Sequence, residues 1–162
     1  MSVNVFFAFG VGHRIQQAAL TAAKNYRSAK KMLVFSSEQK RLDSFSRMLW
    51  DLAPESFIPQ ESIHSAGHLA AVLNEEWAEA NKAQPVLLLQ NAELLTSAEL
   101  ASKAPEIWLL NLDLACPPEY QRFAYVLEIV SEHQADKQYA RERWKQYRAE
   151  GAELISHQVG NK

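Results

Sequence analysis

Short apolar runs alternate along the chain with segments of helical spacing, and this alternation limits the possible folds more than any other feature. The apolar runs predict strands at 3–9, 32–35, 57–58, 86–89, 107–112 and 125–130. Most of them are continuous rather than alternating, which is typical of strands buried on both faces of a parallel sheet. Apolar residues recur every three or four positions in the segments 15–26, 42–52, 69–80 and 94–103, which indicates helices. The sequence therefore predicts a three-layer α/β fold, with a mostly parallel sheet and helices on both faces.

Length and composition predict one α/β domain that covers residues 1–162, with only the last few residues frayed. A chain of 162 residues is long enough to bury its own core. It contains no apolar run near 18 residues, so no membrane span is expected. The single cysteine, Cys116, cannot form an internal disulfide and has no obvious activating base. We therefore expect an inert thiol and a cytoplasmic protein.

Positive charge is concentrated near the C-terminal end of the chain. The segment from Lys137 to Arg148 contains five bases and one acid, whereas the whole chain has a net charge of −2. The segment's charge of +4 leaves −6 for the remainder. A Ser-x-x-Gln pattern at 131–134 predicts a capping box at the start of this helix, and Gly151 is placed to end it.

At 100° per residue, one stripe of this helix combines cations with an aromatic side chain. The stripe is about 100° wide and contains Lys137, Arg141, Trp144, Lys145 and Arg148. Ala140 and Tyr147 lie beside Trp144, so one side of the stripe is apolar. Such a surface suits an anionic partner that also buries an apolar group. The alternative is a solvated basic face, stabilised by the helix dipole in its last turn.

Sites of catalysis and cofactor binding are not predicted. After the first strand, Gly10 and Gly12 lack the third glycine of a dinucleotide fingerprint, because Ile15 stands in its place. The pattern of a phosphate loop is also missing there. His64 and His68 are four residues apart, but no third ligand is placed to complete a zinc site. We therefore expect no catalytic residues, no cofactor and no metal, and the chain is expected to present a binding surface.

Two stretches resemble the chi subunit family of bacterial DNA polymerase III. The first is the helix segment 140–148, Ala-Arg-Glu-Arg-Trp-Lys-Gln-Tyr-Arg, with Gly151 after it. The second is Leu49-Trp50 followed by Glu-Ser-Phe-Ile-Pro at 55–59. The sequence departs from the family at Phe45-Ser46 and Gln60. It also has a helix-like segment at 66–82 where the family has a Gly-rich stretch.

The resemblance implies a non-catalytic adaptor on a nucleotide-binding-like fold without a phosphate loop. Members of this family pair with the psi subunit of the clamp-loader assembly. They also bind the acidic C-terminal tail of single-stranded DNA-binding protein, which ends in aspartates, a proline and a phenylalanine. On this chain, Lys137, Arg141 and Lys145 are suited to the carboxylates, and Trp144 to the aromatic ring. Leu49 is expected in the core, whereas Trp50 is either core or an exposed contact for a partner such as psi.

Two other functions remain open at this stage. One is a direct single-stranded nucleic-acid-binding module that uses the basic helix and its aromatic residues. The acidic remainder of the chain argues against it. The other is an enzyme with an unusual nucleotide site, which nucleotide-induced thermal stabilisation would reveal; none is expected.

Overall fold

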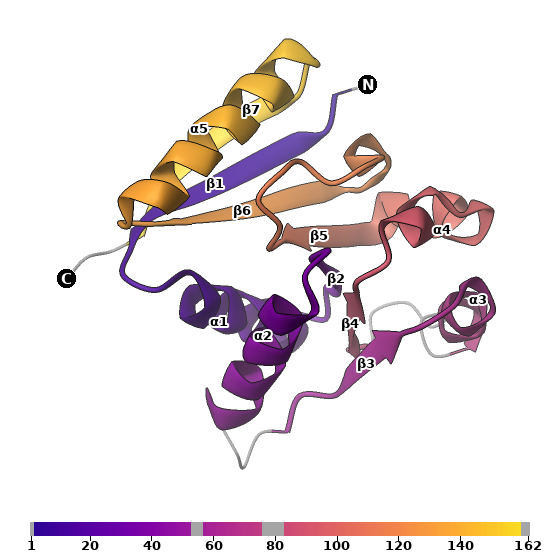
Figure 1. Cartoon of the computed structure of the whole chain (residues 1–162). Helices are drawn as coiled ribbons and strands as arrows, with labels where there is room; N and C mark the ends of the chain where they lie inside the picture. The colour runs from indigo at the N-terminus through magenta and orange to yellow at the C-terminus, as the bar shows by residue number, and fades with distance from the viewer. Residues whose placement is uncertain (1, 53–56, 76–82, 160–162) are drawn as a thin grey trace.

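The computed structural model describes residues 2–52, 57–75 and 83–159. Within these ranges seven strands form one parallel sheet in the order β3-β4-β2-β5-β6-β1-β7 (Figure 1). The strands are β1 (Asn4–Val11), β2 (Lys31–Phe35), β3 (Gln60–Ile63), β4 (Val86–Leu89), β5 (Ile107–Asn111), β6 (Tyr125–Ser131) and β7 (Glu153–Gln158). The helices are α1 (Arg14–Arg27), α2 (Gln39–Leu52), α3 (Ala66–Glu75), α4 (Ala98–Lys103) and α5 (Gln134–Ala149). The predicted three-layer α/β class is confirmed.

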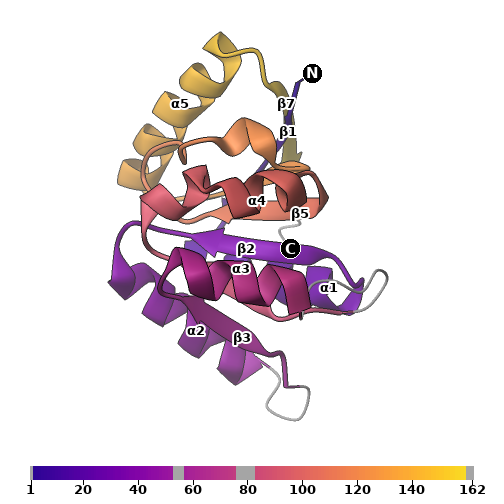
Figure 2. The ribbon, with the colours of Figure 1, turned by 90° about the vertical axis from the view of Figure 1, so that its right-hand side faces the viewer.

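Helices cover both faces of the sheet, as Figures 1 and 2 show. On one face α1 and α2 contribute their apolar stripes to a core with β2, β4 and β5. On the other face α3, α4 and α5 share a core with the opposite side chains of the same sheet. The buried line predicted for α2 was Leu42, Phe45, Leu49 and Leu52; the first three are buried and Leu52 is partly buried. No helix in the described ranges is both long and apolar enough to cross a membrane.

Two elements were predicted wrongly, and one strand was missed. Phe57 and Ile58 do not form a strand; the strand begins at Gln60, immediately after Pro59, and pairs with β4. The predicted helix 94–103 is divided, because Ser97 caps a new helix by accepting a hydrogen bond from the backbone N–H of Leu100 at 3.3 Å. Strand β7 was not predicted at all, since it is an edge strand of mixed polarity. Of the predicted helix at 66–82, residues 66–75 are helical and residues 76–82 lie outside the described residues.

Helix α5 is fixed at both ends by local contacts. At its start, Ser131 does not form the predicted capping box; its backbone N–H and its hydroxyl both donate to the Asp136 carboxylate at 2.7 Å. At its end, Gly151 adopts a left-handed φ of +89°, as its predicted position requires. The N–H groups of Gly151 and Ala152 then bond to the carbonyls of Arg148 and Tyr147 in a Schellman motif. Local contacts therefore define where α5 begins and where it ends.

A buried charged cluster joins α5 to the sheet. The fully buried Glu128 carboxylate accepts hydrogen bonds from Arg143 Nε at 2.9 Å, Asn111 Nδ2 at 2.8 Å and the Tyr147 hydroxyl. The Arg14 guanidinium lies 3.9 Å from the same carboxylate. Burial, and then the charge of Glu128, raise the pKa of Tyr147 well above its usual value, so this hydroxyl stays a donor. Arg143 is thus part of the core and does not contribute to the basic surface of α5.

Candidate binding cavity beneath helix α5

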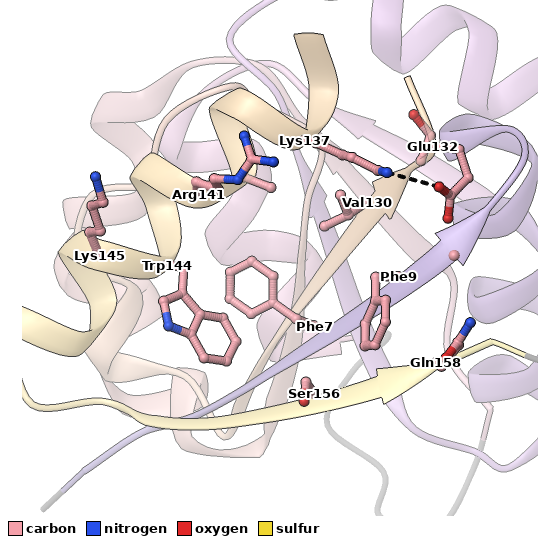
Figure 3. Close-up of a pocket in the computed structure, with 13 residues that line it drawn as sticks. Phe7, Phe9, Val130, Glu132, Lys137, Arg141, Trp144, Lys145, Ser156 and Gln158 are labelled. Carbon is pink, nitrogen blue, oxygen red and sulfur yellow. Dashed lines mark ion pairs between the residues drawn. The ribbon is translucent and has the colours of Figure 1, made fainter. Parts of the chain in front are cut away.

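A cavity of about 570 Å³ lies between α5 and the carboxyl ends of β1, β6 and β7 (Figure 3). Ligand sites of open α/β sheets commonly lie at this end of the strands. The cavity is lined by Phe7, Phe9, Gly10, Val130, Ser131, Glu132, Lys137, Ala140, Arg141, Trp144, Lys145, Ser156 and Gln158. We refer to it as the α5 cavity.

The floor of the α5 cavity is apolar and aromatic. Phe7 of β1 packs against Trp144 of α5, with ring centroids 5.0 Å apart and an edge-to-face angle of 64°. Val130 and Ala140 are almost completely buried beside them. Phe9 remains 38% exposed at the open end of the cavity. The floor can therefore bury a further apolar or aromatic group without first displacing a side chain.

A distortion of β1 opens this end of the cavity. The pairing of β1 with β6 shifts register between Ala8 and Val11. Between them, Gly10 has a φ of +81°, and a Cβ on it would lie 3.3 Å from Gln158 Cγ. A side chain at position 10 would thus be strained and would press against the wall that β7 provides. Glycine keeps this corner open.

The rim of the α5 cavity is cationic. Lys137 Nζ lies 3.0 Å from Glu132 Oε1, and Lys145 Nζ lies 3.8 Å from Glu142 Oε2. Arg141 bonds only to the neutral side chain of Gln138, at 3.0 Å, and has no carboxylate partner among the described residues. The lining contains three cations and one carboxylate, so the rim is positively charged although the whole chain is negative. An anionic ligand would be attracted to Arg141 first.

Four of the five predicted site residues line this cavity, and one does not. Lys137, Arg141, Trp144 and Lys145 come together there, whereas Arg148 is exposed and lies outside the lining. Sequence reasoning missed the contributions of the strands, which are Phe7, Phe9, Val130, Ser156 and Gln158. Phe7, Phe9 and Val130 lie in the apolar runs 3–9 and 125–130, which were interpreted as buried strands. Ser156 and Gln158 lie in no such run.

The glycine pair, the histidine pair and the cysteine do not form a cofactor, metal or nucleophile site within the described residues. Gly10 lies within the distorted end of β1, and Gly12 lies in the turn before α1, where His13 Nδ1 accepts a hydrogen bond from the N–H of Gln16 at 3.2 Å. His68 Nε2 lies 2.9 Å from Glu61 Oε2, but within the described residues no three His, Cys, Asp or Glu side chains could hold a metal ion. Burial raises the pKa of the Cys116 thiol to about 12, so very little thiolate forms near neutral pH.

Trp50 is exposed rather than part of the core. Its side chain is 60% exposed and contacts the equally exposed Phe57 edge to face, with centroids 5.4 Å apart. Leu49 is buried, as expected. The two exposed aromatic rings form a surface at the end of α2, away from the α5 cavity. We refer to Trp50 and Phe57 as the α2 aromatic pair.

Comparison with known proteins identifies the family. The sequence model of the family described as DNA polymerase III chi subunit, HolC, matches residues 1–155. The DNA polymerase III subunit chi of Pseudomonas aeruginosa is 30% identical over 146 residues, which cover 90% of this chain and 87% of that protein. The subunit of the same name from Haemophilus influenzae is 26% identical over 139 residues, covering 86% of this chain and 83% of its own. The protein belongs to the DNA polymerase III chi subunit family.

Proposed function

We propose that the chain is a non-catalytic adaptor of the replicative polymerase, and that the α5 cavity binds the acidic C-terminal tail of single-stranded DNA-binding protein. The observation that carries the proposal is the combination of an aromatic floor and a cationic rim in a chain whose net charge is negative. The tail needs both: a buried place for its terminal phenylalanine and cations for its aspartates and terminal carboxylate. A cytoplasmic location belongs to the same proposal.

The rim and the floor should respond differently to salt. Lys137→Ala and Lys145→Ala should each weaken tail binding at low salt, and their effects should shrink at high salt because exposed charges are screened. Trp144→Ala removes apolar burial, worth about 1 to 3 kcal/mol, so its loss of affinity should persist at high salt. The measurement is a titration of each variant with the tail peptide at two salt concentrations, with unfolding followed in parallel. Binding by Trp144→Ala that recovers fully at high salt would contradict the role of the floor.

The α2 aromatic pair is proposed as the contact for the psi subunit. Exposed tryptophan is uncommon on a surface without a partner and is enriched at the energetic centres of interfaces. Trp50→Ala should weaken binding of psi at least tenfold, about 1.4 kcal/mol, and leave the tail affinity unchanged. Leu20→Ala is the control, because Leu20 is also an exposed apolar residue but lies on α1. Normal psi binding by folded Trp50→Ala would exclude the α2 aromatic pair from that interface.

A further inference from the structure

Part of the sheet face opposite α5 is left uncovered by helices. The cores of α1 and α2 form mainly with β2, β4 and β5, so the side chains of β1 and β6 near this edge are only half-buried. A groove of about 480 Å³ runs there between α1 and the strands β1, β5, β6 and β7. We refer to it as the sheet groove. It lies on the other side of β1 from the α5 cavity, because Phe6 and Ala8 line the groove whereas Phe7 and Phe9 line the cavity.

One wall of the sheet groove is an aromatic surface. Trp108 of β5 and Tyr125 of β6 are paired neighbours with ring centroids 4.2 Å apart. Phe6 of β1 extends the surface, since its ring lies 5.5 Å from Tyr125 and is nearly parallel to Trp108, at 13°. All three side chains are half-buried. Phe6 and Trp108 line the groove, whereas Tyr125 packs against them from outside the lining. The rings of Phe6 and Trp108 are therefore the ones suited to stacking on another planar ring.

The charged side chains of the sheet groove that have no ion-pair partner among the described residues are positive. Its lining contains Lys24, Lys30 and Glu128 as charged residues, and the Glu128 carboxylate is buried on the opposite face against Arg143. Neither lysine has an ion-pair partner among the described residues. Lys30 Nζ lies over the Trp108 ring, 4.3 Å from its centre, so a planar ring that stacks there takes the place of this ammonium group.

A buried amide donor without a partner lies in the same lining. Asn25 of α1 is 6% exposed, and its Nδ2 has no hydrogen-bond partner among the described residues. A buried donor of this kind costs free energy unless an acceptor reaches it. A planar ligand that carries ring carbonyl groups, enters the groove and shifts this side chain would supply one.

We propose that the sheet groove binds single-stranded nucleic acid, with a base stacked on the wall formed by Phe6 and Trp108 and the adjoining phosphates beside Lys24 and Lys30. Aromatic stacking combined with cations along the backbone is the general mode of binding single strands without sequence preference. A base also offers ring carbonyl acceptors to the Asn25 amide. Because only two lysines are available, the contact is salt-sensitive and local. It differs from nucleic-acid binding by the basic helix, which lies on the other face.

The test is the binding of a labelled oligothymidylate, followed by fluorescence anisotropy over a range of salt concentrations. The double variant Lys24→Glu/Lys30→Glu should bind at least tenfold more weakly at low salt. Its plot of log affinity against log salt should be shallower by about 1.4, the slope of two phosphate contacts on a single strand. Trp108→Leu should also weaken binding at least tenfold. Phe6→Leu should have the same effect, and it serves as the test if Trp108→Leu does not fold.

Matched controls distinguish binding in the sheet groove from nonspecific electrostatic attraction between the chain and the oligonucleotide. Lys40→Glu/Arg47→Glu makes the same charge change at exposed positions of α2 and should leave oligothymidylate binding unchanged. Arg141→Glu should also leave oligothymidylate binding unchanged, because Arg141 lies at the α5 cavity. Equal losses in the α2 control, or loss in Arg141→Glu, would overturn the proposal, as would a wild-type chain that binds no oligothymidylate at low salt. Self-association that Trp108→Leu abolishes, without oligothymidylate binding, would assign the groove to a second copy of the chain and overturn the proposal as well.

Discussion

Arg141→Glu is expected to abolish binding of the tail peptide without unfolding the protein. Arg141 lines the α5 cavity and has no carboxylate partner among the described residues, so its charge is available to a ligand. The substitution places a carboxylate against the aspartates of the tail, and like charges in contact at an interface cost several kcal/mol. Stability should change by less than about 0.5 kcal/mol, since the side chain is exposed. Calorimetric titration with the peptide and denaturant unfolding measure the two effects.

Arg148→Glu is the matched control for this prediction. It makes the same charge change on the same helix, but Arg148 lies outside the lining of the cavity. We expect a small loss of affinity, removed by salt, because the charge acts at a distance in water. Equal losses in the two variants would mean that the tail recognises the charge of the whole helix rather than the α5 cavity.

The largest expected effect on stability comes from Glu128→Gln. Glu128 is fully buried and compensates both Arg143, at 2.9 Å, and Arg14, at 3.9 Å. Glutamine removes the charge and turns an amide nitrogen toward groups that are themselves donors, either Arg143 or Asn111 and Tyr147. Breaking a buried pair by changing one partner typically costs about 3 to 5 kcal/mol.

Urea unfolding measures this loss, and Glu142→Gln is the control. Glu142 is an exposed carboxylate of α5 that lies 3.8 Å from Lys145, so its replacement should change the free energy of unfolding by less than about 0.5 kcal/mol. A cost below about 1 kcal/mol for Glu128→Gln would contradict the view that this cluster fixes α5 on the sheet.

The basic helix could be predicted from the sequence because its residues follow one another at helical spacing. Trp144, Arg141 and Lys137 are placed on one side by the geometry of the helix alone. The predicted strands 86–89 and 107–112 were also recognisable, since they are buried on both faces and contain few polar residues. A strand that is buried on both faces can be recognised from a short stretch of sequence, because its residues form an uninterrupted apolar run.

The strand side of the cavity could not be predicted, because it depends on how distant segments pair. Strand β7 has exposed residues on both faces, so it lacks the apolar run of an inner strand. Phe9 looked like core because it ends an apolar run, but it lines the α5 cavity and is 38% exposed. The buried position of Arg143 depends on Glu128, fifteen residues earlier, and on the packing of α5 against β6. Arg143 was counted among the five bases of the segment 137–148, and the count does not show that its side chain is buried.

The central claim is that the tail binds between α5 and the ends of β1, β6 and β7. The most direct test is an NMR titration of the ¹⁵N-labelled chain with the tail peptide. The amides of Gly10, Ser131, Ala140, Ser156 and Gln158 and the indole N–H of Trp144 should shift, because they surround the α5 cavity. The indole N–H signals of Trp50 and Trp108 should stay in place. Shifts confined to the surroundings of Trp50 or Trp108, with the cavity amides unchanged, would contradict the claim.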